Sequence, residues 1–215
     1  MYSLNFINKI YSFWGKAPFI YNTLNLITFL GKEKFLRQNT VAKVGLKKGD
    51  TVLDIACGFG VNFENLRHAV GKNGKIIGFD YTQGMLDAAK RKYLDKLEWK
   101  NVELIQGDAA ELDLPEGSVD GIISTLGISA IPRHFIALQK AKNVLKPGKN
   151  MVILDANLFS GLLKIFNPFL KLAYIISASW DYKKDIIGDF KKLFGEIQLS
   201  EYNQSTMYIL KGTKK

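Results

Sequence analysis

At 215 residues, the chain is long enough for one domain with a sizeable core, with or without an extension. Its composition, 47% hydrophobic and 23% charged, is that of an ordinary globular protein without low-complexity segments or internal repeats. The single cysteine, Cys57, excludes an intrachain disulfide and favours a reducing compartment such as the cytoplasm.

The formal net charge of +10 suits an anionic partner, either nucleic acid or an anionic membrane surface. The lysines are spread along the whole chain, and most of them are expected on solvated helix faces. The sequence contains no segment that interleaves aromatic and basic residues in the manner of RNA-binding proteins. Nucleic acid is therefore the less supported of the two partners.

The first 37 residues are unusually apolar. Residues 2–14 place aromatic and aliphatic side chains at helical spacing, and residues 21–31 form a second apolar stretch before a basic segment, residues 32–37. A signal peptide is not predicted, because the start lacks positive charge and Asn5, Asn8 and Lys9 interrupt the apolar run. We predict that residues 1–40 form a helical lid over a site in residues 41–215.

The first predicted strand, residues 51–55, runs directly into a glycine turn. Val52, Leu53 and Ile55 suit a strand that is buried on both faces. Gly58 and Gly60 let the backbone turn sharply and approach a ligand closely. Residues 61–70 have the apolar spacing of a helix, so the segment is predicted as strand, glycine loop and helix.

Two further strands end in carboxylates. Residues 75–79 lead to Asp80, which can accept both hydroxyls of a ribose, and residues 102–106 lead to Gly107 and Asp108. This spacing also fits a dinucleotide dehydrogenase. Phe63, however, stands where a third glycine would come, and Asp54 would repel a pyrophosphate. A ribose and a charged amino-acid tail account for the acids better.

The remaining elements complete an alternating pattern of strands and helices. We predict strands at residues 119–124 and 151–154, a helix at 137–145, and a terminal hairpin of residues 196–202 and 206–211. The pattern predicts an α/β fold: a Rossmann-like three-layer sandwich with a seven-stranded, mostly parallel sheet and a terminal antiparallel hairpin.

The residues Val52-Leu-Asp-Ile-Ala-Cys-Gly-Phe-Gly60, Gly78-Phe-Asp80, Gly107-Asp-Ala109 and Val144-Leu-Lys-Pro-Gly148 resemble class I S-adenosylmethionine-dependent methyltransferases. The resemblance covers roughly residues 47–155. It departs from the family at Ala56 and Lys149, where the family often has glycine.

The resemblance implies a role for each matching residue. Asp54 with the Gly58 and Gly60 loop would hold the methionine part of S-adenosylmethionine, and Asp80 would hold the ribose hydroxyls. At the adenine, Met85 would cover the face, Asp108 would bind the exocyclic amine, and Ala109 would supply a backbone donor. The predicted cofactor-binding set also includes Ala56, Tyr81 and Thr125.

Residues 21–25, 31–37 and 79–86 look like the ubiquinone and menaquinone C-methyltransferases and the bacterial phosphatidylethanolamine N-methyltransferases, and residues 124–132 are closer to the second group. Residues 158–180 form an apolar insertion, but Lys164, Pro168 and Lys171 argue against a transmembrane helix. These features favour a lipid or other apolar acceptor, specifically an amphipathic lipid: an aminophospholipid head group such as phosphatidylethanolamine, or a prenylated quinol. They also favour a cytoplasmic enzyme, peripheral on the inner face of the membrane. A soluble small-molecule methyltransferase and a non-catalytic binding protein are the alternatives.

Methyl transfer from a sulfonium needs little acid–base chemistry beyond removal of one proton from the acceptor. Candidates for that step are Tyr21, which we favour, Asp155, Thr125 and Tyr11. His134 is expected to be an exposed polar residue, and Cys57 is expected to be a packing residue rather than a nucleophile. Cys, His and carboxylates do not occur with metal-ligand spacing, so no metal is predicted.

Overall fold

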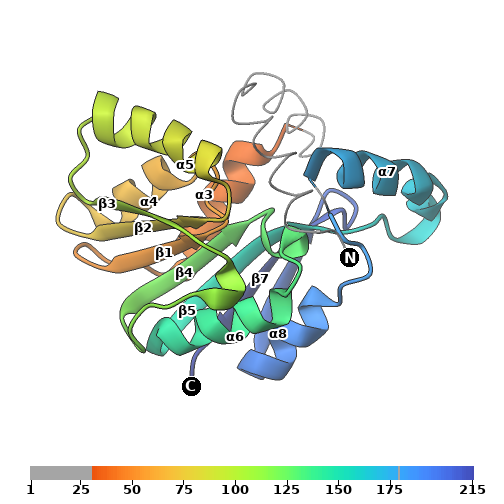
Figure 1. Ribbon diagram of the computed structural model, residues 1–215. Coiled ribbons are helices and arrows are strands. Elements are labelled where there is room, and N and C mark those ends of the chain that lie inside the picture. The colour runs from red at the N-terminus through yellow and green to blue at the C-terminus, as the bar shows by residue number, and fades with distance from the viewer. Residues whose placement is uncertain (1–30, 179) are drawn as a thin grey trace.

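A seven-stranded sheet forms the centre of the protein (Figure 1). The computed structural model describes residues 31–178 and 180–215, and the strands follow the order β3-β2-β1-β4-β5-β7-β6. Strands β1 to β5 pair in parallel, whereas β7 is antiparallel to β5 and β6. This arrangement confirms the predicted fold. The strands are β1 (Thr51–Ile55), β2 (Lys75–Asp80), β3 (Val102–Gln106), β4 (Val119–Thr125), β5 (Leu145–Ala156), β6 (Ile197–Tyr202) and β7 (Met207–Thr213).

Helices cover both faces of the sheet (Figure 1). The helices α3 (Glu33–Val44), α4 (Phe63–Val70) and α5 (Gln83–Ala89) lie on one face, and α6 (His134–Val144) and α8 (Ile186–Phe194) lie on the other. Shorter turns connect them: the π-helix η1 (Lys90–Lys96) and the 3₁₀ turns η2 (Ala109–Glu111) and η3 (Ile128–Ala130). The result is the three-layer sandwich that the sequence predicted.

The strand side chains alternate between two separate apolar cores. Val52 packs with α3, α4 and α5, while Leu53 and Ile55 pack with α6 and α8. Both faces of β1 are buried, which is why its sequence is almost continuously apolar. Asp54 lies between Leu53 and Ile55, so its side chain points to the same face of the sheet as that of Val52, into the layer of α3 and α4. There the carboxylate is completely buried.

Some element boundaries differ from those predicted. Strand β5 begins at Leu145 rather than at Met151, with a register shift against β4 between Val119 and Gly121. Helix α3 extends across residue 40, and its buried side chains include Leu36 and Arg37. Of the predicted lid, residues 1–40, the first 30 residues lie outside the described part of the chain.

The predicted apolar insertion connects β5 to α8. It contains the 3₁₀ turn η4 (Gly161–Phe166) and helix α7 (Asn167–Ala178), which stand beside the sheet rather than on either face (Figure 1). Within the described part of the chain, no helix is both long and apolar enough to span a membrane.

Candidate active site

The carboxyl ends of the parallel strands surround an open hollow. Strands β2 and β4, helix α5 and the loops after β1, β2, β3 and β4 supply its walls. Eight of the predicted cofactor-binding residues line it: Ala56, Gly58, Asp80, Tyr81, Met85, Asp108, Ala109 and Thr125. Asp54 and Gly60 do not line the hollow.

Asp80 is held rigidly at the end of β2. One carboxylate oxygen accepts the backbone N–H of Gly58 at 2.8 Å, and the other accepts that of Thr82 at 2.8 Å. Burial raises the pKa of Asp80, and the two amide donors oppose this shift. Each oxygen keeps a further lone pair, so this carboxylate can still accept two hydroxyl donors from the hollow.

The glycine loop after β1 uses left-handed backbone at three positions. Gly58 has φ +56° and a Cβ there would meet nothing within 4 Å, whereas a Cβ on Gly60 would lie 2.7 Å from the rings of Phe63 and Tyr93. Gly60 therefore serves packing behind the loop, where the Tyr93 hydroxyl also donates to its carbonyl at 2.8 Å. Ala56 has φ +56°, a region that glycine adopts at lower cost.

The other end of the hollow carries Asp108. One of its oxygens accepts the Ala110 N–H at 2.9 Å, and the other accepts a guanidinium N–H of Arg133 at 2.8 Å. Arg133 also binds Glu111 at 2.7 Å. Met85 and Ala109 are buried beside it and form part of the apolar wall. Arg133 could not be assigned to Asp108 from the sequence pattern, because 25 residues separate the two.

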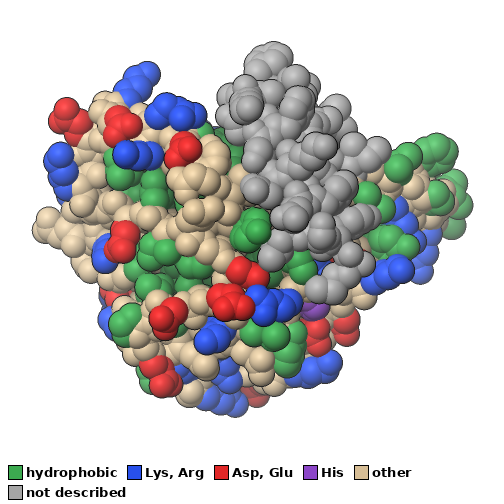
Figure 2. Space-filling view, viewed as in Figure 1, with side chains coloured by type: hydrophobic (Ala, Val, Ile, Leu, Met, Phe, Trp, Pro, Cys, Tyr) green, Lys and Arg blue, Asp and Glu red, His purple; other side chains and the backbone are tan. Residues whose placement is uncertain are grey.

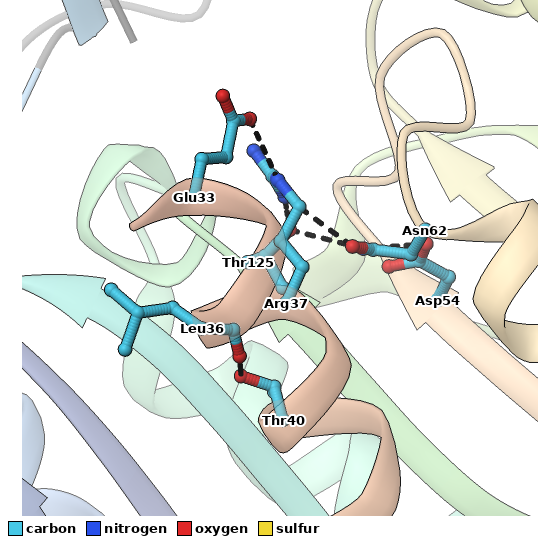
Figure 3. Close-up of polar contacts among 7 residues, drawn as sticks. All are labelled: Glu33, Leu36, Arg37, Thr40, Asp54, Asn62 and Thr125. Atoms are coloured by element: carbon cyan, nitrogen blue, oxygen red, sulfur yellow. Dashed lines mark hydrogen bonds and ion pairs between the residues drawn. The ribbon is translucent and has the colours of Figure 1, made fainter. Parts of the chain in front are cut away.

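Asp54 belongs to a buried polar network below the hollow (Figure 3). One of its oxygens accepts the Asn62 amide at 3.1 Å, and the same amide donates to the Thr125 hydroxyl at 3.0 Å. Arg37 of α3 donates to that hydroxyl at 2.6 Å and to the Asn62 carbonyl oxygen at 3.3 Å. Arg37 in turn pairs with Glu33 at 2.8 Å. The network therefore links α3 to the ends of β1 and β4.

The second oxygen of Asp54, Oδ1, has no hydrogen-bond partner among the described residues, although the side chain is completely buried. Burial raises the pKa of Asp54 to about 7, against the opposing effects of the Asn62 hydrogen bond and the Arg37 charge. A buried carboxylate with one unsatisfied oxygen is costly without a ligand. Thr125, which lines the hollow, shares the Asn62 amide with Asp54, so this network connects the buried carboxylate to the wall of the hollow.

Asp155, one of the two predicted catalytic residues, does not line the hollow. It is completely buried at the end of β5 and accepts the Ser129 N–H at 2.9 Å, the Ser129 hydroxyl at 2.7 Å and the Ala156 N–H at 2.8 Å. This position differs from the expectation that Asp155 faces the acceptor, because strand β5 turns the side chain toward the loop after β4. Tyr21 and Tyr11 lie outside the described residues.

Cys57 and His134 are the two other residues with side chains that could take part in chemistry. Cys57 lines the hollow but is buried, and burial raises the pKa of its thiol well above the ordinary value, so a thiolate nucleophile is disfavoured. His134 is only half-buried and lies 3.0 Å from Asp189 of α8, so it joins α6 to α8 rather than standing free in solvent.

The site also contains residues that the sequence did not point to. Each of them has a hydrogen-bond partner 22 to 88 residues away in the chain: Arg37, Asn62, Ser129, Arg133 and Lys184. None of them belongs to a spacing motif, so only the tertiary contacts connect them to the site.

A family model described as the ubiE/COQ5 methyltransferase family matches residues 8–205. The chain belongs to this family. The match confirms the resemblance that the sequence motifs carried, and S-adenosylmethionine is the cofactor of this methyltransferase. The open space at Gly58 fits such a ligand in the hollow, and the buried Asp54 with its unpartnered oxygen lies in the network behind the hollow.

The chain is similar to two curated relatives named demethylmenaquinone methyltransferase. One, from Oceanobacillus iheyensis, is 34% identical over 137 residues, which cover 64% of this chain and 57% of the relative. The other, from Staphylococcus aureus, is 31% identical over 176 residues, which cover 82% of this chain and 67% of the relative. The chain thus spans well under two thirds of the length of the first relative.

A solved structure supports the fold. A SAM-dependent methyltransferase from Aquifex aeolicus superposes with a TM-score of 0.61 at 22% identity, covering 92% of this chain and 98% of that one. At this identity the likeness shows a shared fold, and the acceptor must be argued from other observations.

Proposed function

We propose that this methyltransferase acts on a prenylated quinol, as the two relatives named demethylmenaquinone methyltransferase do by their names. Those names carry the proposal, and the hollow supports it. Beside Thr125 its wall is apolar, formed by Leu126, Ala130, Ile131 and Pro132, which suits a flat aromatic ring better than a charged head group.

We place S-adenosylmethionine along the carboxyl edge of the sheet. Asp80 would accept the ribose hydroxyls, since both of its oxygens keep a free lone pair. The unpartnered oxygen of Asp54 would accept the ammonium of the methionine part, with the Gly58 loop and Ala56 beside it and Gly60 shaping the loop from behind. The remaining residues would hold the adenine or close the hollow around the cofactor: Tyr81, Met85, Asp108, Ala109 and Thr125.

Bound S-adenosylmethionine supplies a methyl group on a sulfonium that is already activated for transfer. The protein's task is then to hold the acceptor carbon in line with the bond that breaks, a gain for which effective molarities reach ~10⁵–10⁸ M. The apolar wall of residues 126–132 would orient the ring and exclude water. Asp155 would act indirectly, because two of its hydrogen bonds fix Ser129 and thereby this wall.

A ring carbon that gains a methyl group must lose its proton. Tyr21 remains our prediction for the residue that receives it. A Tyr21→Phe variant should therefore lower the turnover number while leaving the binding of S-adenosylhomocysteine unchanged. Equal turnover of the variant and the wild type would remove Tyr21 from the mechanism.

The acceptor is tested with the full chain, methyl-labelled S-adenosylmethionine and vesicles that contain either demethylmenaquinol or phosphatidylethanolamine. We expect label in the quinone fraction alone. Label in the phospholipid alone would overturn the quinol proposal in favour of a head-group acceptor, and label in neither lipid would favour a soluble acceptor. A soluble small phenol as a third arm identifies that last case.

Cofactor binding is measured separately, by the thermal shift that S-adenosylhomocysteine produces. Asp80→Ala should abolish the shift, whereas Asp87→Ala, an exposed carboxylate on the neighbouring helix α5, should keep it. A protein that shows the shift but transfers no methyl group would be a non-catalytic binding protein. We place the reaction in the cytoplasm, on the inner face of the membrane that would hold a prenylated acceptor.

A further inference from the structure

The insertion between β5 and α8 presents a continuous apolar face to solvent. Its members follow a helical spacing along one side of η4 and α7, with Leu162 94% exposed and Phe169 75% exposed. Figure 2 shows them as hydrophobic side chains gathered over the outer end of this region. We call this the η4–α7 face, and its residues are Leu162, Ile165, Phe166, Phe169 and Leu172.

This concentration is unusual within the molecule. The other large apolar side chains exposed on the described part of the chain are scattered over separate elements: Phe35, Leu97, Ile136, Tyr182 and Leu199. Scattered apolar residues are normal on a protein surface, whereas a contiguous apolar patch marks a binding surface. The η4–α7 face therefore has the character of a binding surface.

The opposite side of the same segment is firmly packed, so the exposure does not come from a loose helix. Tyr174 and Trp180 are both buried, with their ring centroids 5.3 Å apart in an edge-to-face arrangement. Leu170 packs against the core. At the start of α7, the Asn167 side chain bonds both the N–H and the carbonyl of Phe159, at 2.9 and 3.2 Å.

The charges on the segment that carries the face have one sign. Residues 158–180 contain two lysines, Lys164 and Lys171, and no acid. Figure 2 shows Lys or Arg side chains next to the apolar ones in this region. An anionic lipid surface attracts such a rim by about 1 kcal/mol for each basic residue near it. A protein partner with an apolar patch would have no need of this rim.

The geometry also excludes insertion across the bilayer. Helix α7 has 12 residues, whereas a membrane-spanning helix needs about 20. An apolar face of this size with lysines beside it is the pattern of a helix that lies in the interfacial plane of the membrane.

The insertion is tied to the active-site hollow. It leaves the sheet at Ala156 and returns through Lys184, whose ammonium donates to the carbonyls of Ser129 at 2.6 Å and Ile131 at 2.7 Å. Ile131 lines the hollow. A surface docked against the η4–α7 face would thus contact the insertion, which also holds the apolar wall of residues 126–132 through Lys184.

We propose that the η4–α7 face docks this protein on an anionic lipid bilayer, with the apolar side chains in the interface and the lysines at the head groups. The proposal rests on the proposed function only in giving a reason for docking, since a prenylated acceptor resides in the membrane. Its partner is the lipid surface itself rather than the acceptor molecule.

The test is co-sedimentation of the full chain with vesicles of phosphatidylcholine and phosphatidylglycerol, compared with vesicles of phosphatidylcholine alone. The wild type should bind the anionic vesicles more tightly, and salt should weaken the binding. The double variant Leu162→Glu with Phe169→Glu should bind at least about tenfold less, because both large side chains lose their apolar contact with lipid. The matched control, Leu97→Glu with Ile136→Glu, changes two exposed apolar residues elsewhere and should bind as the wild type does.

Several results would overturn the proposal: no binding of the wild type to anionic vesicles at low salt, or equal loss in the two double variants. A concentration-dependent dimer in sedimentation velocity that the Leu162 and Phe169 variant abolishes would assign the face to a second copy of the chain. The thermal shift with S-adenosylhomocysteine checks that each variant is folded. If the glutamates prevent folding, Lys164→Gln with Lys171→Gln replaces them, and unchanged salt dependence would then refute the proposal.

Vesicle binding needs no turnover, so its outcome is separate from that of the acceptor assay. A chain that binds anionic vesicles through this face but does not methylate demethylmenaquinol refutes the proposed function alone. If the chain methylates the quinol in detergent but does not bind vesicles, only the docking proposal is refuted.

Discussion

The buried carboxylate of Asp54 makes the stability of the cofactor-free protein depend on pH in a way that a single substitution removes. Its folded pKa of about 7 lies above the ordinary value of 3.8, so the folded state holds the proton more tightly than the unfolded state does. This contribution to stability is fully present below pH 3.8 and is lost as the pH rises through 7.

The magnitude follows from the two pKa values. About three pKa units correspond to a contribution of about 4 kcal/mol, and about 3 kcal/mol of it is lost between pH 5 and pH 8. Asp54→Asn carries no titrating group, so its free energy of unfolding should gain about 3 kcal/mol relative to the wild type over that interval. For a chain of this size, this is a relative shift of roughly 6–12 °C in the melting temperature.

The measurement is thermal or urea unfolding of both proteins without cofactor, at pH 5, 6, 7 and 8. The substitution also leaves an amide donor where Oδ1 was unpartnered, a cost of about 1–3 kcal/mol that is the same at every pH. The pH-dependent difference is therefore the decisive quantity. A constant difference between Asp54→Asn and the wild type from pH 5 to pH 8 would refute the reasoning. The variant should also lose the thermal shift with S-adenosylhomocysteine.

Three further predictions concern the glycine loop and its surroundings. Gly60→Ala should destabilise the protein by about 2–4 kcal/mol in urea unfolding, because the new Cβ would lie 2.7 Å from Phe63 and Tyr93 at a left-handed φ. The control is Gly84→Ala in helix α5, where the new Cβ meets open space. This variant should be neutral or stabilising by up to about 1 kcal/mol. Tyr93→Phe should lower the free energy of unfolding by about 1–2 kcal/mol in the same assay, since the Gly60 carbonyl loses its buried donor. An unchanged unfolding midpoint would show that this hydrogen bond does not stabilise the protein. Cys57 should resist iodoacetamide at pH 7 in the folded protein and react after unfolding, as followed by mass spectrometry; rapid native labelling would contradict the raised pKa.

Much of the site was predictable because the chemistry lies at strand ends. Asp80 follows an apolar run that can only be a buried strand, and parallel strands bring their carboxyl ends to one edge. The same reasoning placed Gly58 and Asp108 at that edge, where the structure has them. Local pattern and topology were sufficient for these residues.

The sequence did not reveal side-chain directions or distant partners. Asp155 also ends a strand, but the loop after β4 folds over it and supplies two of its hydrogen-bond donors through Ser129. Arg37 of α3 is buried beside Asn62 and Thr125, which are 25 and 88 residues away in the chain.

The sequence by itself determined where acids and glycines follow the strands, and with this the fold, the family and the edge of the sheet where we place the cofactor, because these depend on periodicity and short-range spacing. Only the tertiary structure decided which buried acid is left with an unpartnered oxygen, as at Asp54, and which apolar residues remain in solvent, as at Leu162 and Phe169. Burial and pairing depend on contacts between residues far apart in the chain, and a linear pattern does not contain them.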